Sequence, residues 1–173
     1  MRTSIVLLAV AAAAAASGCA SAARPAVPGD SASPAGPPCT SASLRARIAG
    51  TDTGLGQSAT TIELSGGSAT ICRLRGVPAV DLLDAHGDLV SAAVPQPRGG
   101  GTAAVVAVSR AGVASFVVTY RNFDSVTGRA CTPVTALGIG LPGGAGRITL
   151  AAELAPCGQV SVSEFRSGVG QEN

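Results

Sequence analysis

The stretch Ala114–Arg121, which reads A-S-F-V-V-T-Y-R, decides the fold of this chain. Apolar side chains recur at every second position. Ala114, Phe116, Val118 and Tyr120 would therefore share one face of a strand. Successive side chains of a strand point to opposite faces, and β-branched and aromatic residues are typical of strands. The stretch therefore predicts a strand with one face in a hydrophobic core.

Similar short apolar segments recur between glycines and prolines along most of the chain. We expect strands at residues 43–49, 60–64, 69–74, 79–83, 89–94, 102–108, 113–121, 134–141, 147–154 and 160–165. The alanine-rich segments have helical propensity, but glycines interrupt them before a capped helix could form. Many short strands at such spacing are typical of a sandwich. The sequence predicts an all-β, immunoglobulin-like antiparallel β-sandwich.

The N-terminus has the features of an export signal. Residues 1–18 hold Arg2, then an apolar run, then small residues directly before Cys19. This is a lipobox arrangement, in which Cys19 receives diacylglycerol and becomes the new N-terminus. The apolar run is too short to span a bilayer. We expect a lipoprotein signal over 1–18, an Ala/Pro/Ser-rich tether over 19–38 and a domain over 39–173, anchored to the outer face of the cell membrane. The alternative is an ordinary secretory signal that is cut nearby, so that Cys19 is lost and the protein is secreted.

The cysteines beyond Cys19 indicate two disulfides. Four cysteines remain, and an even number in an exported chain favours pairing. Three pairings are possible, and we favour Cys39–Cys72 with Cys131–Cys157 because these close the shorter loops. The sequence has no C-x-x-C and a single His, so we expect no metal site and no cofactor.

Composition excludes some partners. The chain is 46% hydrophobic but only 2% aromatic, so the core has to be built from Val, Leu, Ile and Ala. The net charge is +2, and no run of basic residues could neutralise several phosphates in a row. Nucleic acid binding is therefore not expected, and neither is a polybasic membrane patch.

The residues that could carry chemistry are few. His86 is the single histidine and falls in Asp84–Asp88, where we expect a tight hairpin with Gly87 at positive φ. Asp81 and Asp84 would face opposite sides of a strand, so a cation site with His86 and Asp88 is not expected. With no second histidine and no nucleophile motif, we expect no catalytic residues and no enzyme activity.

The segment Cys72–Leu82, which reads C-R-L-R-G-V-P-A-V-D-L, resembles a known family. Its pattern C-x-L-x-G-x-P-x-V-x-L is similar to the core of domain of unknown function 4232, found on exported actinobacterial proteins and lipoproteins. Cys39, Cys131 and Pro156-Cys157-Gly158 agree with it, and the likeness covers residues 39–165. The chain departs from the pattern at two positions: Val77 stands where Tyr is common, and Ser65 stands where Asn is common. The resemblance implies an all-β sandwich with four cysteines and brings no catalytic residues.

These observations lead to an expected function. We expect a non-catalytic interaction module of the cell envelope that binds an envelope protein or a cell-wall polymer and is a monomer. The alternatives are a carrier of an apolar ligand or lipid, and then an enzyme. The candidate contact residues lie in two loops: Arg98 in the glycine-rich loop 95–101, and Arg121 and Phe123 in the segment 121–129. Phe123 is either an exposed anchor or a lid on the core.

Overall fold

A computed structural model describes residues 36–67, 71–96, 102–128, 131–144 and 146–169. The predicted signal, most of the predicted tether, Cys19 and Arg98 lie outside the described residues. The chain divides into two units, residues 1–31 and residues 32–173, and the second holds every described strand, both disulfides and the hydrophobic core. Residues 32–173 are therefore a self-contained folding unit. None of the described residues forms a helix long and apolar enough to cross a membrane.

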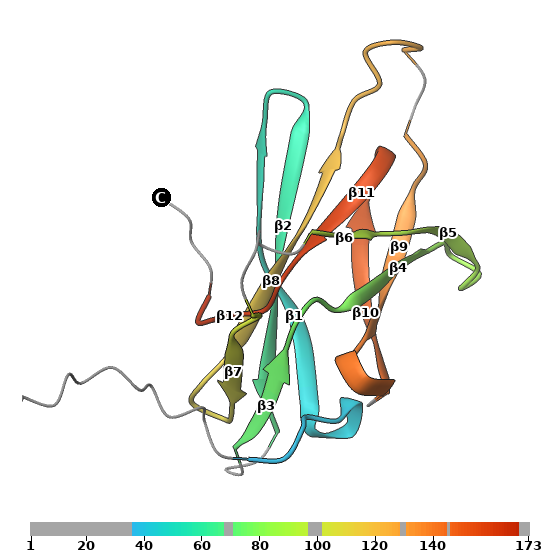
Figure 1. Ribbon diagram of the computed structural model, residues 1–173. Helices are drawn as coiled ribbons and strands as arrows, with labels where there is room; N and C mark the ends of the chain where they lie inside the picture. The colour runs from blue at the N-terminus through green and yellow to red at the C-terminus, as the bar shows by residue number, and fades with distance from the viewer. Residues whose placement is uncertain (1–35, 68–70, 97–101, 129–130, 145, 170–173) are drawn as a thin grey trace, which may run out of the picture. The chain divides into compact units, whose positions relative to one another are not determined.

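The described part of the chain is built almost entirely from strands (Figure 1). Two short 3-10 segments, η1 (Ser41–Ser43) and η2 (Pro142–Gly144), accompany them. The strands are β1 (Leu44–Gly54), β2 (Gln57–Gly66), β3 (Cys72–Arg75), β4 (Ala79–Leu83), β5 (Leu89–Ala92), β6 (Val94–Gln96), β7 (Val105–Val108), β8 (Ala114–Arg121), β9 (Val134–Gly140), β10 (Arg147–Leu154), β11 (Cys157–Ser163) and β12 (Arg166–Ser167).

Three sheets arrange these strands. The largest has the order β1-β2-β8-β11-β6, and β12 also pairs with β8. A second sheet has the order β10-β9-β4-β5, and β3 pairs with β7 in a third. All pairs are antiparallel except β6 with β11. The predicted all-β fold is confirmed, and the arrangement is compatible with an immunoglobulin-like sandwich.

Strand β8 lies at the centre of the largest sheet, and its even-numbered side chains face the core, as its alternation predicted. Phe116 and Val118 are fully buried, and Tyr120 is nearly so. Phe116 packs edge to face against Phe165, with ring centroids 5.7 Å apart. Most of the other core side chains are aliphatic and come from all three sheets, among them Ile62, Leu64, Leu74, Leu82, Val106, Leu137, Ile139 and Val160. The sheets therefore share one core, although the chain has few aromatic residues.

The outer face of this sheet also buries polar side chains. Glu63 on β2 lies opposite Ser115 on β8, and both are nearly inaccessible to solvent. Arg47 on β1 donates two hydrogen bonds to the Glu63 carboxylate, of 3.1 Å and 2.5 Å. Because a buried carboxylate without a partner would be costly, this pairing allows Glu63 to lie within the sheet.

The segment 89–94 differs from the single strand that we expected. The chain forms β5 in one sheet, and after Ala93 it forms β6 in another. The N–H of Ala93 donates to the carbonyl of Val80, 2.8 Å away, and Val94 then pairs in parallel with Ser161 of β11. Apolar residues continue through this change of sheet (residues 89–94 read L-V-S-A-A-V), so the sequence pattern contained no sign of it. Strand β12 was also not expected, while β4 and β10 have the predicted bounds.

Two disulfides join distant segments at opposite ends of the domain. Cys39 bonds to Cys72, with Cα atoms 4.9 Å apart, and Cys131 bonds to Cys157, with Cα atoms 4.8 Å apart. These are the pairs favoured from the sequence. We call the end of the domain with Cys39 and β3 the base, and the end with the β8–β9 connection the loop end (Figure 1).

Candidate functional site

The segment that follows β8 is held in a defined shape by one carboxylate. Oδ1 of Asp124 accepts hydrogen bonds from the N–H groups of Val126, at 3.0 Å, and Thr127, at 3.2 Å. Oδ2 accepts a short hydrogen bond from the Thr127 hydroxyl. The carbonyl of Asp124 accepts the N–H of Gly128, 3.0 Å away, and Gly128 has a φ of 64°. The segment is therefore an Asp-centred turn, in which the side chain replaces backbone partners.

These hydrogen bonds also affect the charge of the turn. The hydroxyl of Thr127, followed by the N–H groups of Thr127 and Val126, lowers the pKa of the Asp124 carboxyl. Hydrogen bonds donated to a carboxylate favour its ionised form. Asp124 is therefore a negative charge of the turn at neutral pH.

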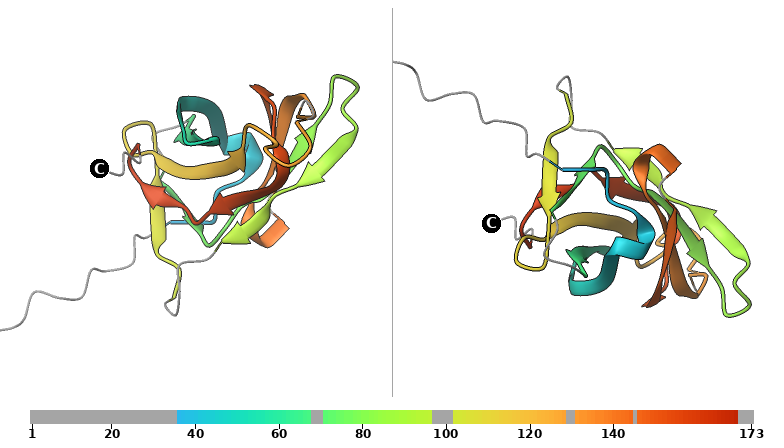
Figure 2. Two further views of the ribbon diagram at one scale, coloured as in Figure 1. Left: turned by 90° about the horizontal axis from the view of Figure 1, so that it is seen from above. Right: turned by 90° about the horizontal axis from the view of Figure 1, so that it is seen from below.

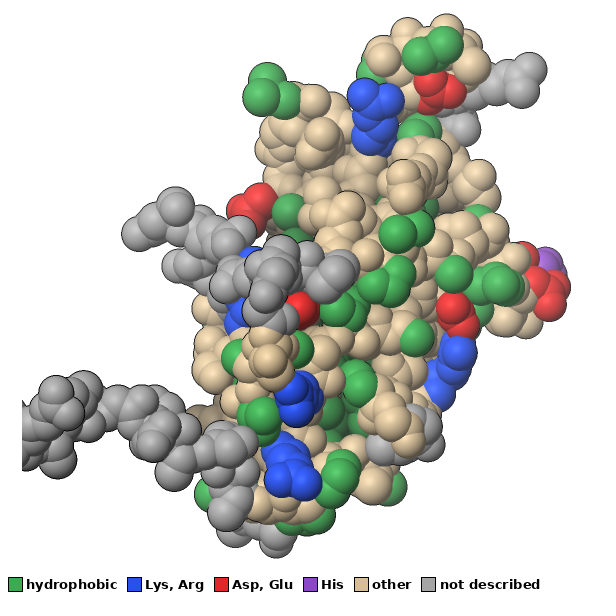
Figure 3. Space-filling view, in the orientation of Figure 1, with side chains coloured by type: hydrophobic (Ala, Val, Ile, Leu, Met, Phe, Trp, Pro, Cys, Tyr) green, Lys and Arg blue, Asp and Glu red, His purple; other side chains and the backbone are tan. Residues whose placement is uncertain are grey.

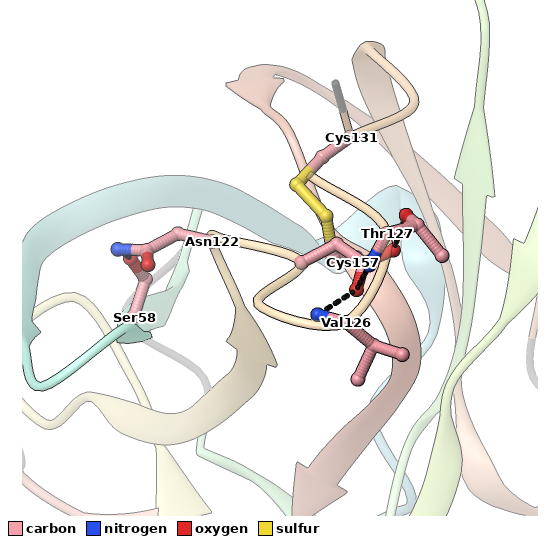
Figure 4. Close-up of a disulfide and its surroundings, with 7 residues drawn as sticks. Ser58, Asn122, Val126, Thr127, Cys131 and Cys157 are labelled. Carbon is pink, nitrogen blue, oxygen red and sulfur yellow. Dashed lines mark hydrogen bonds between the residues drawn. A yellow bond between two sulfur atoms is a disulfide. The ribbon is translucent and has the colours of Figure 1, made fainter. Parts of the chain in front are cut away.

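Asn122 ties the start of this segment to the neighbouring hairpin. Its N–H donates to the carbonyl of Gly56, 3.1 Å away, and its side-chain Nδ2 donates to the hydroxyl of Ser58 at 2.9 Å. Ser58 is buried on β2, so this bond reaches a rigid part of the sheet. Figure 4 shows Asn122 and Ser58 on one side of the segment and the Cys131–Cys157 disulfide on the other. The segment is thus attached at both sides.

A surface pocket of about 610 Å³ lies beside this segment. We call it the loop pocket; its lining is mixed, with a guanidinium, a carboxylate, an aromatic ring, an amide, a hydroxyl and a disulfide. These groups belong to Arg121, Phe123, Asp124, Cys131, Thr132, Pro156, Cys157, Gly158 and Gln159. The lining comes from three parts of the chain: the end of β8 with its turn, the segment before β9, and the β10–β11 connection. The disulfide joins the second part to the third.

The loop pocket contains two of the three contact residues predicted from the sequence. Arg121 and Phe123 both line it, whereas Arg98 lies outside the described residues. Phe123 is 60% exposed, so it is a surface aromatic and not a lid on the core. Sequence reasoning missed Asp124 as the organiser of the turn, although its signal, Asp three residues before Thr and four before Gly, can be read in the sequence. It also missed Gly158 and Gln159, which only the fold brings to this place.

The predicted hairpin at His86 is confirmed as a turn. The N–H groups of His86 and Asp88 donate to Oδ1 of Asp84, at 2.8 Å and 2.9 Å, and Gly87 has a φ of 83°. The hydrogen bond from the N–H of Asp88, followed by that from the N–H of His86, lowers the pKa of the Asp84 carboxyl. The β4–β5 hairpin projects from one side of the domain in both views of Figure 2. Asp84 is thus occupied by the turn itself.

A second acidic residue of this region is also engaged. Asp81 on β4 forms an ion pair with Arg147 on β10. Within the described ranges, no three His, Cys, Asp or Glu side chains come together as a metal site would require. The expectation that the protein is not an enzyme stays a prediction.

The chain matches the family described as domain of unknown function (DUF4232) over residues 39–169. This range covers most of the chain and includes both disulfides and the whole loop pocket. The protein therefore belongs to the DUF4232 family. No curated protein and no solved structure matches the chain.

Proposed function

We propose that this protein is an exported, lipid-anchored interaction module of the cell envelope, without catalytic activity, which binds its partner through the loop pocket. The two intramolecular disulfides point to an extracytoplasmic location. The lipobox at Cys19 supports anchoring in the membrane. The partner is an envelope protein or a cell-wall polymer.

The exposure of Phe123 carries this proposal. An aromatic side chain that is 60% exposed contributes little to the stability of its own domain, but a ring beside an arginine is typical of interface anchors. The turn around Asp124, the bond from Asn122 to Ser58 and the nearby disulfide hold this region in place before binding. A site that is rigid beforehand loses less conformational entropy when it binds.

The position of the pocket supports the same function. The chain reaches the domain at the base, through Gly36–Cys39, whereas the loop pocket lies at the opposite end (Figure 1). A protein anchored through its N-terminus would therefore present this pocket away from the membrane. No observation on the described residues favours the carrier alternative, because the side chains between the sheets are packed into one buried cluster.

The test compares two exposed apolar residues of the same turn. Phe123 lines the loop pocket, whereas Val126, which is 86% exposed, does not line it. Residues 32–173 carrying Phe123→Ala should bind cell-wall polymer or solubilised envelope protein at least about tenfold more weakly than the parent, and Val126→Ala should bind as the parent does. The free energy of unfolding of each variant should lie within about 0.5 kcal/mol of that of the parent, since surface substitutions rarely cost more stability.

Two outcomes would contradict the proposal. Equal binding by the parent and by Phe123→Ala would remove the loop pocket from the function. A bound apolar molecule, found by native mass spectrometry of residues 32–173 and released on denaturation, would favour the carrier alternative instead.

A further inference from the structure

A second hollow lies at the base of the domain and differs from the loop pocket in its charge. It has a volume of about 390 Å³ and is lined by Arg73 and Arg75 together with apolar Pro38, Leu74, Val105 and Pro142. We call it the arginine groove. None of the described residues that line it carries a carboxylate. Basic side chains lie over β3 on this face of the molecule (Figure 3).

The two arginines lie on one face of β3. Side chains two residues apart in a strand point to the same face. Cys72 and Leu74 are buried, so Arg73 and Arg75, which alternate with them, both face outward. The Nε of Arg75 donates to the carbonyl of Ala103 at 3.2 Å. This bond positions the guanidinium of Arg75 and uses one of its five N–H donors, so that four are available to a ligand. Arg73 is exposed.

The backbone beneath the groove is fixed. The N–H of Cys39 donates to the carbonyl of Arg73 at 3.0 Å, and the N–H of Arg73 donates to the carbonyl of Pro37 at 2.9 Å. The Cys39–Cys72 disulfide closes the same region. The arginine groove is thus a preformed positive surface at the point where the chain enters the domain.

We propose that the arginine groove docks on the headgroups of an anionic phospholipid membrane. Two guanidiniums offer paired donors that fit phosphate oxygens, while the proline and valine side chains of the groove suit the boundary between headgroups and acyl chains. The chain also enters the domain at the base, at residues 36–39, so a lipid on Cys19 would raise the concentration of the groove at the membrane that holds it. The proposal rests on the anchoring part of the proposed function and does not depend on what the loop pocket binds.

Vesicle flotation of residues 32–173, which lack the lipid, tests this docking directly. The domain should float with vesicles of equal parts phosphatidylcholine and phosphatidylglycerol in low salt. It should not float with phosphatidylcholine alone, and high salt should release it. Each basic residue at an anionic surface contributes about 1 kcal/mol to the free energy of membrane binding. Arg73→Gln and Arg75→Gln should therefore each lower the partition coefficient about fivefold, and the double variant should lower it about thirtyfold.

Arg110 provides the matched control, because it is exposed in the turn after β7 and does not line the groove. Arg110 lies at the same end of the domain, since Val108 pairs with Cys72. Arg110→Gln removes the same charge from this end, and it should lower partitioning less than either groove variant because the paired donors of the groove hold the headgroups. A loss as large as that of Arg73→Gln would mean that net charge governs binding, which overturns a docking role of the groove. Absence of flotation with the anionic vesicles overturns it as well. Either result leaves the Phe123→Ala test of the loop pocket intact.

Discussion

The base and the loop end of the domain each combine a disulfide with a hollow, but the two hollows have different linings. Among the described residues, the arginine groove is lined by two cations and apolar side chains, with no carboxylate. The loop pocket contains a cation, a carboxylate, an aromatic ring and an amide. The groove therefore suits a surface of uniform negative charge, whereas the pocket suits a partner recognised group by group. Under the two proposals, one domain would bind a membrane at one end and a partner at the other.

Removal of each disulfide should give the largest effect. The bonded cysteines are 33 residues apart at the base and 26 residues apart at the loop end, so loss of either bond should lower the free energy of unfolding by about 3.5 kcal/mol. Urea denaturation of the double variants Cys39→Ala/Cys72→Ala and Cys131→Ala/Cys157→Ala measures this.

Binding then separates the two ends. The first variant should lose vesicle binding more than partner binding, and the second should show the reverse, in conditions where both remain folded. Equal losses in both assays would show that the ends do not act separately. A peptide map that joins Cys72 to Cys131 would contradict the pairing itself.

A glycine in the loop pocket gives a smaller effect that is confined to one end. Gly158 has a φ of 72°, and a Cβ built there would meet no other atom within 4 Å. Gly158→Ala should therefore cost only the backbone penalty of the left-handed conformation, about 1 kcal/mol. Thermal unfolding measures this cost, and vesicle flotation should remain unchanged. A cost above about 3 kcal/mol would show that the site is packed more tightly than the structure has it.

Acid should produce the smallest effect, again at the loop end. Because the folded-state pKa of Asp124 is lowered below its ordinary value of 3.8, its hydrogen bonds stabilise the turn fully above that value. This stabilisation is lost as the pH falls through the lower, folded-state pKa. Hydrogen exchange, corrected for intrinsic rates, should show that the Val126 and Thr127 amides lose protection in this pH range. The amide of Arg73, which donates its hydrogen bond to the carbonyl of Pro37, should keep its protection.

Asp124→Asn provides the control for this prediction. The amide does not titrate, and its oxygen still accepts hydrogen bonds, so the protection at Val126 should no longer change with acid. Unchanged protection in the parent down to the acid limit would show that the carboxylate does not hold the turn.

The sequence predicted the features that depend on local pattern. The alternation around Phe116 identified the central strand, and the cysteine spacing favoured the correct disulfides. Arg121 and Phe123 could be singled out because an aromatic between charged residues follows a strand. The fold class and part of the candidate site were therefore accessible before the structure.

Features that depend on contacts between distant segments could not be predicted. The change of sheet at Ala93 falls within a continuous apolar segment, L-V-S-A-A-V over residues 89–94, so periodicity alone could not reveal it. Arg73 and Arg75 are two isolated basic residues in the sequence, and a search for basic runs passes over them. Only the fold brings Pro38, Val105 and Pro142 around them, with no acidic side chain among the described residues of the groove.

The Cys39–Cys72 disulfide also determines how the domain responds to mechanical force. A pull on the N-terminal segment reaches the domain at Cys39, and the covalent bond transmits it to Cys72 at the start of β3. The hydrogen bonds between residues 37–39 and Arg73 can open under load, but the chain cannot peel further while the sulfur–sulfur bond holds. Tension on an anchored protein would thus be borne at the base, and the loop pocket would keep its shape while the cell wall moves against the membrane.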